Sequence, residues 1–564
     1  MSMDPMKPFL DSAVGYVSSM LREAYGIEDT FRIEPGGEIA DFAFPCFQFS
    51  RRAGVSPQEM ADRLAQGAEA AGGMLTVSAR GGYLNMSASP HKLSVAAVGT
   101  VLQMQREYGR ADRPPGERML VEHTSINPTG PMHIGRTRNA VIGDTLVRSL
   151  RQAGVEVASE YYVNDVGKQV VVLYWGLTKF FDGEIGGKPD HELVRHYVRA
   201  NELIEKDESA AAEVRDLQQK LESGDTALLA GTRKAAEMVL DGIKESLAHL
   251  NITHDRFVFE SDLIKDGRVK GVIERLKKLP EASEDKGAWY LPFNGEEDRF
   301  YFTRSDGTSL YTTRDIAYHL DKLSRAGRLV DVLGEDQKLG MKFLVRTLEL
   351  LGEAKRIDFL FHSFVSLAEG KMSTRHGVGV LVDDVISEAK SRAKVEVLKR
   401  RPDMNEGDAS SIAGMVGVGA VRYNIARLQA EKKLVFKWEE ALNFEGSSAP
   451  FIQYSHARAC SILEKAGSWE KGEISYDEDN ELRLARQLAL FPSVLSDIVR
   501  TFAVHKVAAY AQQTAAEFNQ FYRIVPVLRA PPGRLGSRLA LVDASRIVLE
   551  NALCCLGIDA PRTM

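Results

Sequence analysis

The spacing of apolar positions near the start of the chain predicts a small domain of mixed secondary structure. A helical spacing runs from Lys7 to Tyr25, and the segment Gly81 to Met86 is typical of a strand that follows a turn. The stretch Asp112 to Gly116 (Asp-Arg-Pro-Pro-Gly) is rich in residues that break regular structure, so it predicts a linker. We therefore expect residues 1–112 to form an α+β domain.

A second unit begins with the apolar segment Met119 to Glu122. The sequence Asn-Pro-Thr-Gly-Pro at 127–131 interrupts the pattern, a helix starts near His133, and the segment Val155 to Tyr162 predicts a return to strand. This order of strand, loop, helix and strand is typical of a βαβ unit, and such units build parallel sheets. We expect it to open an α/β domain over residues 117–385.

The rest of the chain is mostly helical in pattern. Residues from about 174 to 290 are rich in Glu, Lys and Ala, and they predict a helical insertion in the sheet domain. Strand-like segments resume at 299–303, 329–333 and 359–367. From Val382 onward the pattern is almost wholly helical, so we expect a helical stem over 386–446 and a helical domain over 447–564.

Composition excludes several classes of protein. The 564 residues are 44% hydrophobic and 27% charged, which is typical of a globular protein and excludes a fibrous or disordered chain. No apolar run is long enough to cross a membrane, and no secretory signal is visible at the start. The four cysteines form no C-x-x-C pair, which argues against a zinc site and a disulfide framework and favours the cytoplasm. The net charge of −6 does not by itself indicate a nucleic-acid partner.

The loop from Asn127 to Gly135 has the composition of a phosphate-binding turn. It lies between a predicted strand and a predicted helix, where open α/β sheets bind ligands and helix N-termini offer free N–H groups. Gly135 has no side chain, so a base or phosphate can approach the backbone, and His133 can donate to phosphate oxygens. Taken alone, the triplet His-Ile-Gly also fits an ordinary turn beside a capped helix.

A second loop, Glu369 to Gly377, follows the predicted strand at 359–367. It is bounded by glycines and contains Lys371, Ser373 and Arg375, so it can fold over a triphosphate and stabilise its charge. Alone it also fits an ordinary basic surface loop. Because both loops follow strands of the same predicted sheet, together they indicate a nucleotide site.

The two loops resemble the two signatures of class I aminoacyl-tRNA synthetases, His-Ile-Gly-His and Lys-Met-Ser-Lys. Longer segments are similar to the arginyl-tRNA synthetase family within that class: 125–139, 161–169, 311–319, 371–377, 451–458 and 556–564. The resemblance implies an α/β fold with a Rossmann-type parallel-sheet catalytic domain, a small N-terminal domain that contacts tRNA, and an all-α anticodon-binding bundle.

Two positions depart from the family pattern. Arg136 stands where the family usually has the second histidine of the first signature, and a guanidinium differs from an imidazole in its stacking and hydrogen-bond geometry. Some members have a lysine just before the first signature, but Gly130 occupies that position here. Lys371 therefore becomes the chief candidate for stabilising charge in the second loop.

The resemblance also implies functional residues by position. For catalysis these are His133, Gly135, Arg136, Lys371 and Ser373. For ATP binding they are Pro131, Met132, His133, Gly135, Met372, Ser373 and Arg375. For arginine binding they are Asn127, His133, Glu156, Tyr311, Asp315 and Gln337. For contact with tRNA they are Tyr83, Asn85, Tyr454 and His456.

The carboxylates of Glu156 and Asp315 suit the charged ends of an arginine substrate, because a guanidinium pairs with carboxylates in bidentate geometry. The implied activity is an arginine–tRNA ligase that forms arginyl-adenylate from L-arginine and ATP and then transfers the arginyl group to arginine tRNA. Activation itself is expected to depend on tRNA. We expect Mg²⁺ to accompany ATP without a dedicated protein site, no membrane contact, and a monomer.

Two other functions remain open from the sequence. A nucleotidylyltransferase of the same fold acts on small molecules, but such chains are generally much shorter and lack a large helical C-terminal domain. A non-catalytic tRNA-binding paralogue is supported only by Arg136. A paralogue that had lost activity should have lost both loops and the pocket together, and here His133, Lys371 and the arginine positions remain.

Overall fold

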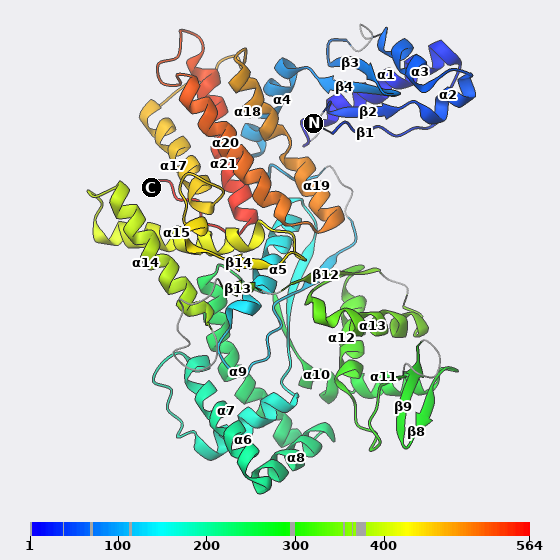
Figure 1. Ribbon diagram of the computed structural model, residues 1–564, viewed down its shortest axis with the longest axis vertical. Helices are drawn as coiled ribbons and strands as arrows, with labels where there is room; N and C mark the ends of the chain where they lie inside the picture. The colour runs from blue at the N-terminus through cyan, green and yellow to red at the C-terminus, as the bar shows by residue number, and fades with distance from the viewer. Residues whose placement is uncertain are drawn as a thin grey trace.

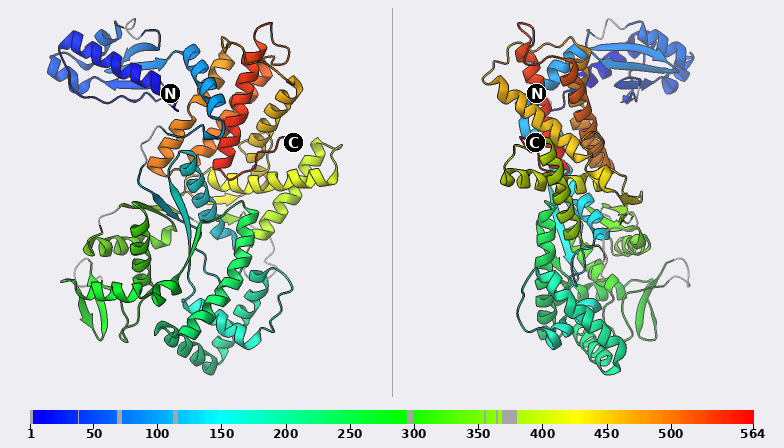
Figure 2. Two further views of the ribbon diagram at one scale, coloured as in Figure 1. Left: turned by 180° about the vertical axis from the view of Figure 1, so that it is seen from behind. Right: turned by 60° about the vertical axis from the view of Figure 1, so that its left-hand side comes forward.

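The computed structural model describes residues 3–37, 39–67, 72–111, 116–293, 299–353, 356–363 and 380–564, and the backbone of 365–367. Figure 1 shows an elongated molecule, and Figure 2 shows the same arrangement from two other sides. The N-terminal domain and the C-terminal helices lie at one end. A parallel sheet lies in the middle, and the helical insertion forms the other end.

The N-terminal domain is an antiparallel sheet of order β1-β2-β4-β3 covered by helices. Its strands are β1 (Glu34–Pro35), β2 (Phe42–Pro45), β3 (Leu75–Arg80) and β4 (Tyr83–Ala88). Its helices are α1 (Lys7–Tyr25), α2 (Phe47–Ala53), α3 (Pro57–Ala65) and α4 (Pro90–Met104). Phe9, Phe44 and Leu84 lie in its separate apolar core. The helix predicted from Lys7 to Tyr25 is confirmed, and four of the five residues of the predicted linker lie outside the described residues.

The central sheet has five parallel strands in the order β12-β11-β5-β6-β7. They are β5 (Met119–Glu122), β6 (Val157–Val163), β7 (Arg256–Phe259), β11 (Arg328–Gly334) and β12 (Arg356–His362). Helix α5 (Ile134–Gln152) connects β5 to β6, so the predicted βαβ unit is confirmed. Leu120, Val121 and Val330 are fully buried in the sheet, as strands covered on both faces require.

The prediction of helices in the insertion is confirmed by α6 (Lys168–Phe180), α7 (Pro189–Lys206), α8 (Glu208–Glu222) and α9 (Thr226–His249). It also contains β7, which belongs to the parallel sheet, so the insertion is not continuous. A strand of four residues between two helices gives too short a pattern to be seen in the sequence. Helices α10 (Glu260–Lys265) and α11 (Arg268–Lys277) follow it.

Two strand predictions need correction. The segment 299–303 contains β10 (Arg299–Tyr301), which pairs antiparallel in a small sheet with β9 (Ala288–Pro292) and β8 (Ser283–Asp285), not in the central sheet. The segment 359–367 is two strands. The central strand β12 ends at His362, and β13 (Val365–Leu367) pairs with β14 (Leu434–Phe436). Helix α12 (Tyr311–Arg325) precedes β11 in the chain, and helix α13 (Lys338–Leu350) follows it.

The C-terminal helices share their core with the parallel sheet. They are α14 (Val382–Arg400), α15 (Glu406–Ala426), α16 (Trp438–Ala441), α17 (Ala449–Ala466), α18 (Asp479–Ala489), α19 (Phe491–Thr501), α20 (His505–Ile524) and α21 (Leu535–Cys555). One apolar cluster runs from Val121 and Ile142 to Leu541 and Leu549. The predicted boundary at residue 447 therefore does not mark a break in packing.

Arg422 of α15 lies at the centre of this shared core with no exposed surface. Its guanidinium donates to the backbone oxygens of Leu556 (2.7 Å) and Leu250 and to the carboxylate of Asp144 in α5. Gly557, with φ +64°, passes so close that a Cβ there would lie 2.2 Å from Arg422 Nη2. One buried charge thus connects the stem, the sheet domain and the end of the C-terminal helices.

Replacing Gly557 by alanine should destabilise the protein because the methyl group has no room beside Arg422. Gly26 is a matched control, since its φ of +66° is nearly the same, its backbone is left-handed (ψ 23°) and a Cβ there would meet nothing within 4 Å. We expect Gly26→Ala to cost about 1 kcal/mol of backbone strain, and Gly557→Ala to cost about 3 kcal/mol or more. Urea unfolding of both variants measures the difference, and equal losses would contradict the predicted clash.

Candidate active site

The site forms at the carboxyl ends of the central strands. Because the five strands are parallel, the ends of β5, β6, β11 and β12 share one edge of the sheet, which is where open parallel sheets bind ligands. The segment from His123 to His133 leaves β5 at this edge and leads into α5. Gln337, in the turn that follows β11, also lies there and is half-buried.

His133 caps the first turn of α5. Its backbone is extended (φ −85°, ψ 145°), and its Nδ1 accepts a hydrogen bond of 3.0 Å from the N–H of Gly135. In the neutral ring the proton then lies on Nε2, which makes the exposed edge of the ring a donor. A Cβ on Gly135 would lie 3.1 Å from Nδ1, so this close cap suits glycine. Partial burial, followed by the charge of Arg136, lowers the pKa of His133.

Backbone hydrogen bonds join the His133 segment to the segment that follows the second loop. Ile134 donates to the Val380 oxygen (3.0 Å), and Val382 donates to the Met132 oxygen (2.9 Å). Met132 is buried and Pro131 half-buried. Lys371, Met372, Ser373 and Arg375 lie outside the described residues, but the chain resumes directly beside His133.

The segment before the second loop is also tied to α5. Arg138 is buried, and it donates to the backbone oxygens of Ser363 (3.1 Å) and Gln429 (2.9 Å). Ser363 directly follows β12. Both described flanks of the second loop are therefore bonded to residues in or beside the first turns of α5.

A network of buried charges lies beside this edge. Lys322 donates to Glu122 (2.8 Å) and Asp331 (2.7 Å), and His319 bonds Asp331 through Nε2 (2.7 Å). Burial alone would lower the pKa of His319, but the carboxylates of Asp315 and Asp331 raise it to about 9. Burial raises the pKa of Glu122 above its ordinary value, against the lowering effect of Lys322.

Tyr311 and Asp315 lie one turn apart at the start of α12 and reach the same region. The Asp315 carboxylate is 3.1 Å from His319 Nδ1, and Tyr311 is 49% exposed. Loss of hydration around the hydroxyl raises the pKa of Tyr311, and the carboxylates of Asp315, Glu260 and Glu122 raise it further. These acidic groups surround a place that suits a cationic substrate. The exposed Asn127 donates to Gln169 Oε1 (2.9 Å).

The prediction that Glu156 binds arginine is wrong. Glu156 precedes β6, and its backbone oxygen accepts from Met119, the first residue of β5. It therefore lies at the amino edge of the sheet, where its side chain is 74% exposed and 3.6 Å from Arg118. Glu122, the last residue of β5, lies at the carboxyl edge instead. Its position at the end of a predicted strand was the signal that could have identified it.

The C-terminal helices form a basic and aromatic groove of about 870 Å³. Tyr454 of α17 is 37% exposed there, and the Arg458 guanidinium lies 4.7 Å from its ring and 5.0 Å from the ring of Tyr522. His456 is not part of this surface, so its predicted role is wrong. It is 2% exposed and bonds the Pro561 oxygen (3.0 Å), because residues two apart on a helix face different sides.

In the N-terminal domain, Tyr83 is partly exposed and packs edge-on against Phe47, with ring centroids 5.2 Å apart. Asn85, two residues along the same strand, is only 5% exposed. Their contact with tRNA stays a prediction, and burial favours Tyr83.

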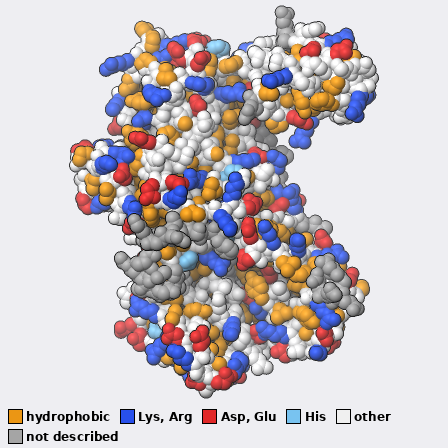
Figure 3. Space-filling view, in the orientation of Figure 1, with side chains coloured by type: hydrophobic (Ala, Val, Ile, Leu, Met, Phe, Trp, Pro, Cys, Tyr) orange, Lys and Arg blue, Asp and Glu red, His pale blue; other side chains and the backbone are white. Residues whose placement is uncertain are grey.

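The face of the molecule in Figure 3 carries charges of both signs. Figure 3 shows Lys and Arg side chains intermingled with Asp and Glu over one face of the molecule. Among the described residues, no helix is both long and apolar enough to cross a membrane. Binding of a polyanion on this face therefore depends on local groups rather than on one field of positive charge.

Comparison with protein families places this geometry in a known group. Residues 97–438 match the family "tRNA synthetases class I (R), catalytic domain", and residues 452–564 match the "DALR anticodon binding domain". A relative from Methanocella arvoryzae named "Arginine--tRNA ligase" is 42% identical over 546 residues, covering 96% of each chain. A relative of the same name from Methanothermobacter thermautotrophicus is 44% identical over 498 residues, covering 87% of each chain.

Solved structures agree with that placement. The arginyl-tRNA synthetase of Thermus thermophilus is similar with a TM-score of 0.82 and 28% identity, covering 98% of this chain and 100% of that one. The arginyl-tRNA synthetase of Plasmodium falciparum has a TM-score of 0.79, with 100% of both chains covered. Its 16% identity supports the fold alone.

Replacing Arg136 by glutamine should raise the pKa of His133, because a neighbouring positive charge disfavours the imidazolium. A protonated Nδ1 no longer accepts the Gly135 N–H, so the acidic limb of any reaction that needs this cap should move to higher pH. NMR titration of the His133 ring measures the shift, with Arg80→Gln in the N-terminal sheet as control. A His133 pKa unchanged or lowered in Arg136→Gln would contradict the assigned cause.

Proposed function

The chain belongs to the arginine–tRNA ligase family of class I tRNA synthetases, and we propose that it activates L-arginine with ATP and transfers the arginyl group to arginine tRNA. The observation that supports this most is the set of backbone bonds between the His133 segment and Val380 and Val382. They hold the first signature against the flank of the second, at the edge of the sheet where acidic groups suit an arginine.

ATP would bind across the N-terminus of α5. Free N–H groups in the first turn and the Nε2–H of His133 can donate hydrogen bonds to phosphate oxygens, and both carry positive partial charge. Lys371 and Ser373 are proposed to complete the phosphate site from the second loop. Arg136 is exposed beside His133 and is proposed to contribute a guanidinium to the same phosphates.

L-arginine would bind on the other side of the same edge. The Asp315 carboxylate and the Tyr311 hydroxyl reach it from α12, and Glu122 from the end of β5. These oxygens can accept from a guanidinium and an α-ammonium in addition to their bonds to Lys322 and His319, whereas a neutral side chain offers them no charged donor. Asn127 and Gln337 are proposed to complete the pocket.

The reaction needs no side-chain nucleophile. The arginine carboxylate attacks the α-phosphorus of ATP, the bond to the β-phosphate oxygen breaks, and arginyl-adenylate and pyrophosphate form. A hydroxyl of the terminal ribose of tRNA then attacks the arginyl carbonyl, and AMP leaves. The residues of the chain act by holding the substrates in line and by balancing charge.

Mg²⁺ would enter with the ATP phosphates and add positive charge there. Among the described residues only Asp190, His191 and Asp383 form a group with ligand atoms close enough to share an ion. Lys188 already donates to both of these carboxylates, so the group does not fit a dedicated magnesium site.

The tRNA is proposed to contact both outer domains. Tyr454, Tyr522 and Arg458 offer aromatic and guanidinium faces on which unstacked anticodon bases can lie. Tyr83 is the proposed contact from the N-terminal sheet. We also propose a monomer that acts in the cytoplasm, and the four free cysteines are in keeping with a reducing compartment.

A non-catalytic paralogue is the alternative, and the relatives do not support it. They are named as ligases and match nearly the whole chain. The distinguishing experiment is arginine-dependent exchange of pyrophosphate into ATP, with and without arginine tRNA. Exchange that requires arginine and appears with tRNA supports the proposal, whereas tRNA binding without any exchange would refute it.

Asp315→Asn should weaken arginine binding because it removes the negative charge and keeps the shape. A charge-assisted hydrogen bond is worth about 2 kcal/mol, which corresponds to a rise of about 30-fold in the KM for arginine. The KM for ATP should change little. Steady-state exchange kinetics measure both constants, and the exposed Asp384→Asn is the control. A larger change for ATP than for arginine would contradict the pocket.

Tyr522→Ala should raise the KM for tRNA in aminoacylation. Stacking of one base on an aromatic ring contributes about 1–3 kcal/mol, so an increase of about 5- to 150-fold is expected. The KM for arginine in the same variant is the internal control, since Tyr522 is in α20, a helix that takes no part in the arginine pocket. An unchanged KM for tRNA would remove this groove from the tRNA contact.

A further inference from the structure

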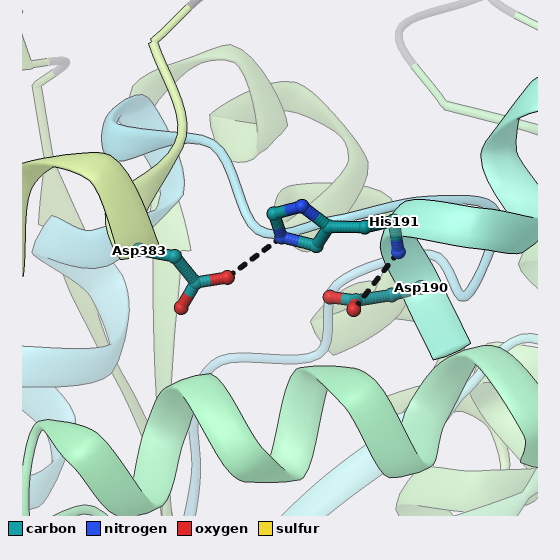
Figure 4. Close-up of side chains that lie close together, drawn as sticks. All are labelled: Asp190, His191 and Asp383. Atoms are coloured by element: carbon teal, nitrogen blue, oxygen red, sulfur yellow. Dashed lines mark hydrogen bonds and ion pairs between the residues drawn. The ribbon is translucent and has the colours of Figure 1, made fainter. Parts of the chain in front are cut away.

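A charged cluster lies outside the groups used above, where the insertion meets the stem. Figure 4 shows Asp190 and His191 in the first turn of α7 and Asp383 at the start of α14. His191 Nε2 and Asp383 Oδ2 are 2.8 Å apart, and Asp190 Oδ1 accepts from the backbone N–H of His191 (3.0 Å). Asp190 has no exposed surface.

By residue type the cluster suits a divalent cation, but a lysine already lies in it. Lys188 Nζ donates to Asp190 Oδ2 (2.9 Å), to Asp383 Oδ2 (2.8 Å) and to the Ser246 hydroxyl (2.6 Å). An ammonium group has three N–H donors, and all three are used. A metal ion on the same two carboxylates would have to displace this ammonium.

Asp383 receives donors from two helices of the insertion. Lys188, just before α7, and His191, in α7, both bond Asp383 Oδ2. Ser246 of α9 donates to Asp383 Oδ1 (2.8 Å). Partial burial alone would raise the pKa of Asp383, but these hydrogen bonds hold it well below its ordinary value. The carboxylate therefore stays ionised and keeps all three donors.

Helix α7 approaches its neighbours closely at two glycines beside the cluster. A Cβ on Gly242 of α9 would lie 2.3 Å from Asp190 Oδ1, and a Cβ on Gly130 would lie 2.7 Å from Val194 of α7. Helix α7 thus packs directly against the loop that leads to His133. Because of the close contact at Gly130, a shift of α7 would displace that loop.

The first turn of α14 is bonded to the same loop. Leu381 pairs with His133, and Val382 donates to the Met132 oxygen (2.9 Å). Asp383 is the next residue in the chain. The cluster therefore anchors the backbone at the point where the flank of the second signature loop meets the first signature.

We propose that Lys188 is a positioning residue for arginine activation, which acts through Asp383 to hold the insertion against the first signature and the described flank of the second. This inference rests on the proposed function. Lys188 donates to Asp190, Ser246 and Asp383, and its ammonium fixes α7, α9 and the start of α14 relative to His133. Its loss should lower the rate of activation more than the affinity for any substrate.

The test measures pyrophosphate exchange, with tRNA present, for the full-length variants Lys188→Met, Asp383→Asn and the double variant. We expect each single variant to lower kcat about 30-fold, with KM for ATP and arginine changed less than threefold. Because the two residues act as one unit, the double variant should also lose about 30-fold, not the product of the two losses. Lys188→Arg should recover part of the rate.

Lys188, His191 and Asp383 line a cavity of about 770 Å³. Lys390→Met is the matched control, because Lys390 of α14 lines this cavity too but has no described bond to a member of the cluster. It should keep the wild-type kcat. Unchanged tRNA binding by the variants, measured by filter retention, shows that the C-terminal groove is still folded. If Lys188→Met does not fold, the Asp383→Asn and Lys188→Arg variants still decide the matter.

Three results would overturn the proposal: full activity of Lys188→Met, losses that multiply in the double variant, or a rise in KM with kcat unchanged. Calorimetric titration of the wild-type protein with Zn²⁺ tests whether a metal ion can occupy the cluster in place of the Lys188 ammonium. Stoichiometric binding that is lost in His191→Ala would also overturn it, and no binding is expected. A wild-type protein with no exchange at all refutes the proposed function instead.

Discussion

The position of α5 depends on two guanidinium groups that have no contact with solvent. Arg138 connects the helix to the segments that precede β13 and β14, and Arg422 of the stem connects it to the residues that directly follow α9 and α21. Arg422 and Asp144 form a buried charge pair, and breaking such a pair typically costs about 3–5 kcal/mol. Arg138 donates to backbone oxygens, and a hydrogen bond of a charged group is worth about 1.5–3 kcal/mol. Since His133 caps the same helix, the geometry of the phosphate site follows from these bonds.

The sequence was sufficient for the elements around the first loop but not for the direction of side chains. The strand from Met119, the break at 127–131 and the helix after His133 follow from periodicity and from Gly and Pro. The predicted parallel unit already puts ligands at the carboxyl ends of its strands, so the position of Glu122 at the end of β5 was a usable signal. Glu156 was implied by the resemblance instead, and the parallel register places it at the amino edge of the sheet.

Tertiary packing decided the other differences. His456 lies in a segment that resembles the family, yet the last residues of the chain cover it, and contacts between distant segments leave no local signal. The strand β7 could not be predicted for a similar reason. Its partner in the sheet is β6, which lies nearly a hundred residues earlier in the chain. The pairing of Lys322 with Glu122 and Asp331 also needed the fold, because the partners come from α12, β5 and β11.

Helix α4 has apolar residues on two faces, and each face belongs to a different core. Leu93 and Ala97 pack in the N-terminal domain, while Val98 and Val101 pack with the C-terminal helices, where α18 lies beside α4. Helix α18 begins at Asp479, 375 residues after α4 ends. At about 5–20 residues per second, the ribosome needs about 20–75 s to supply that partner. During each round of synthesis this apolar face of α4 therefore stays uncovered for at least that time, and it offers a chaperone an exposed apolar target.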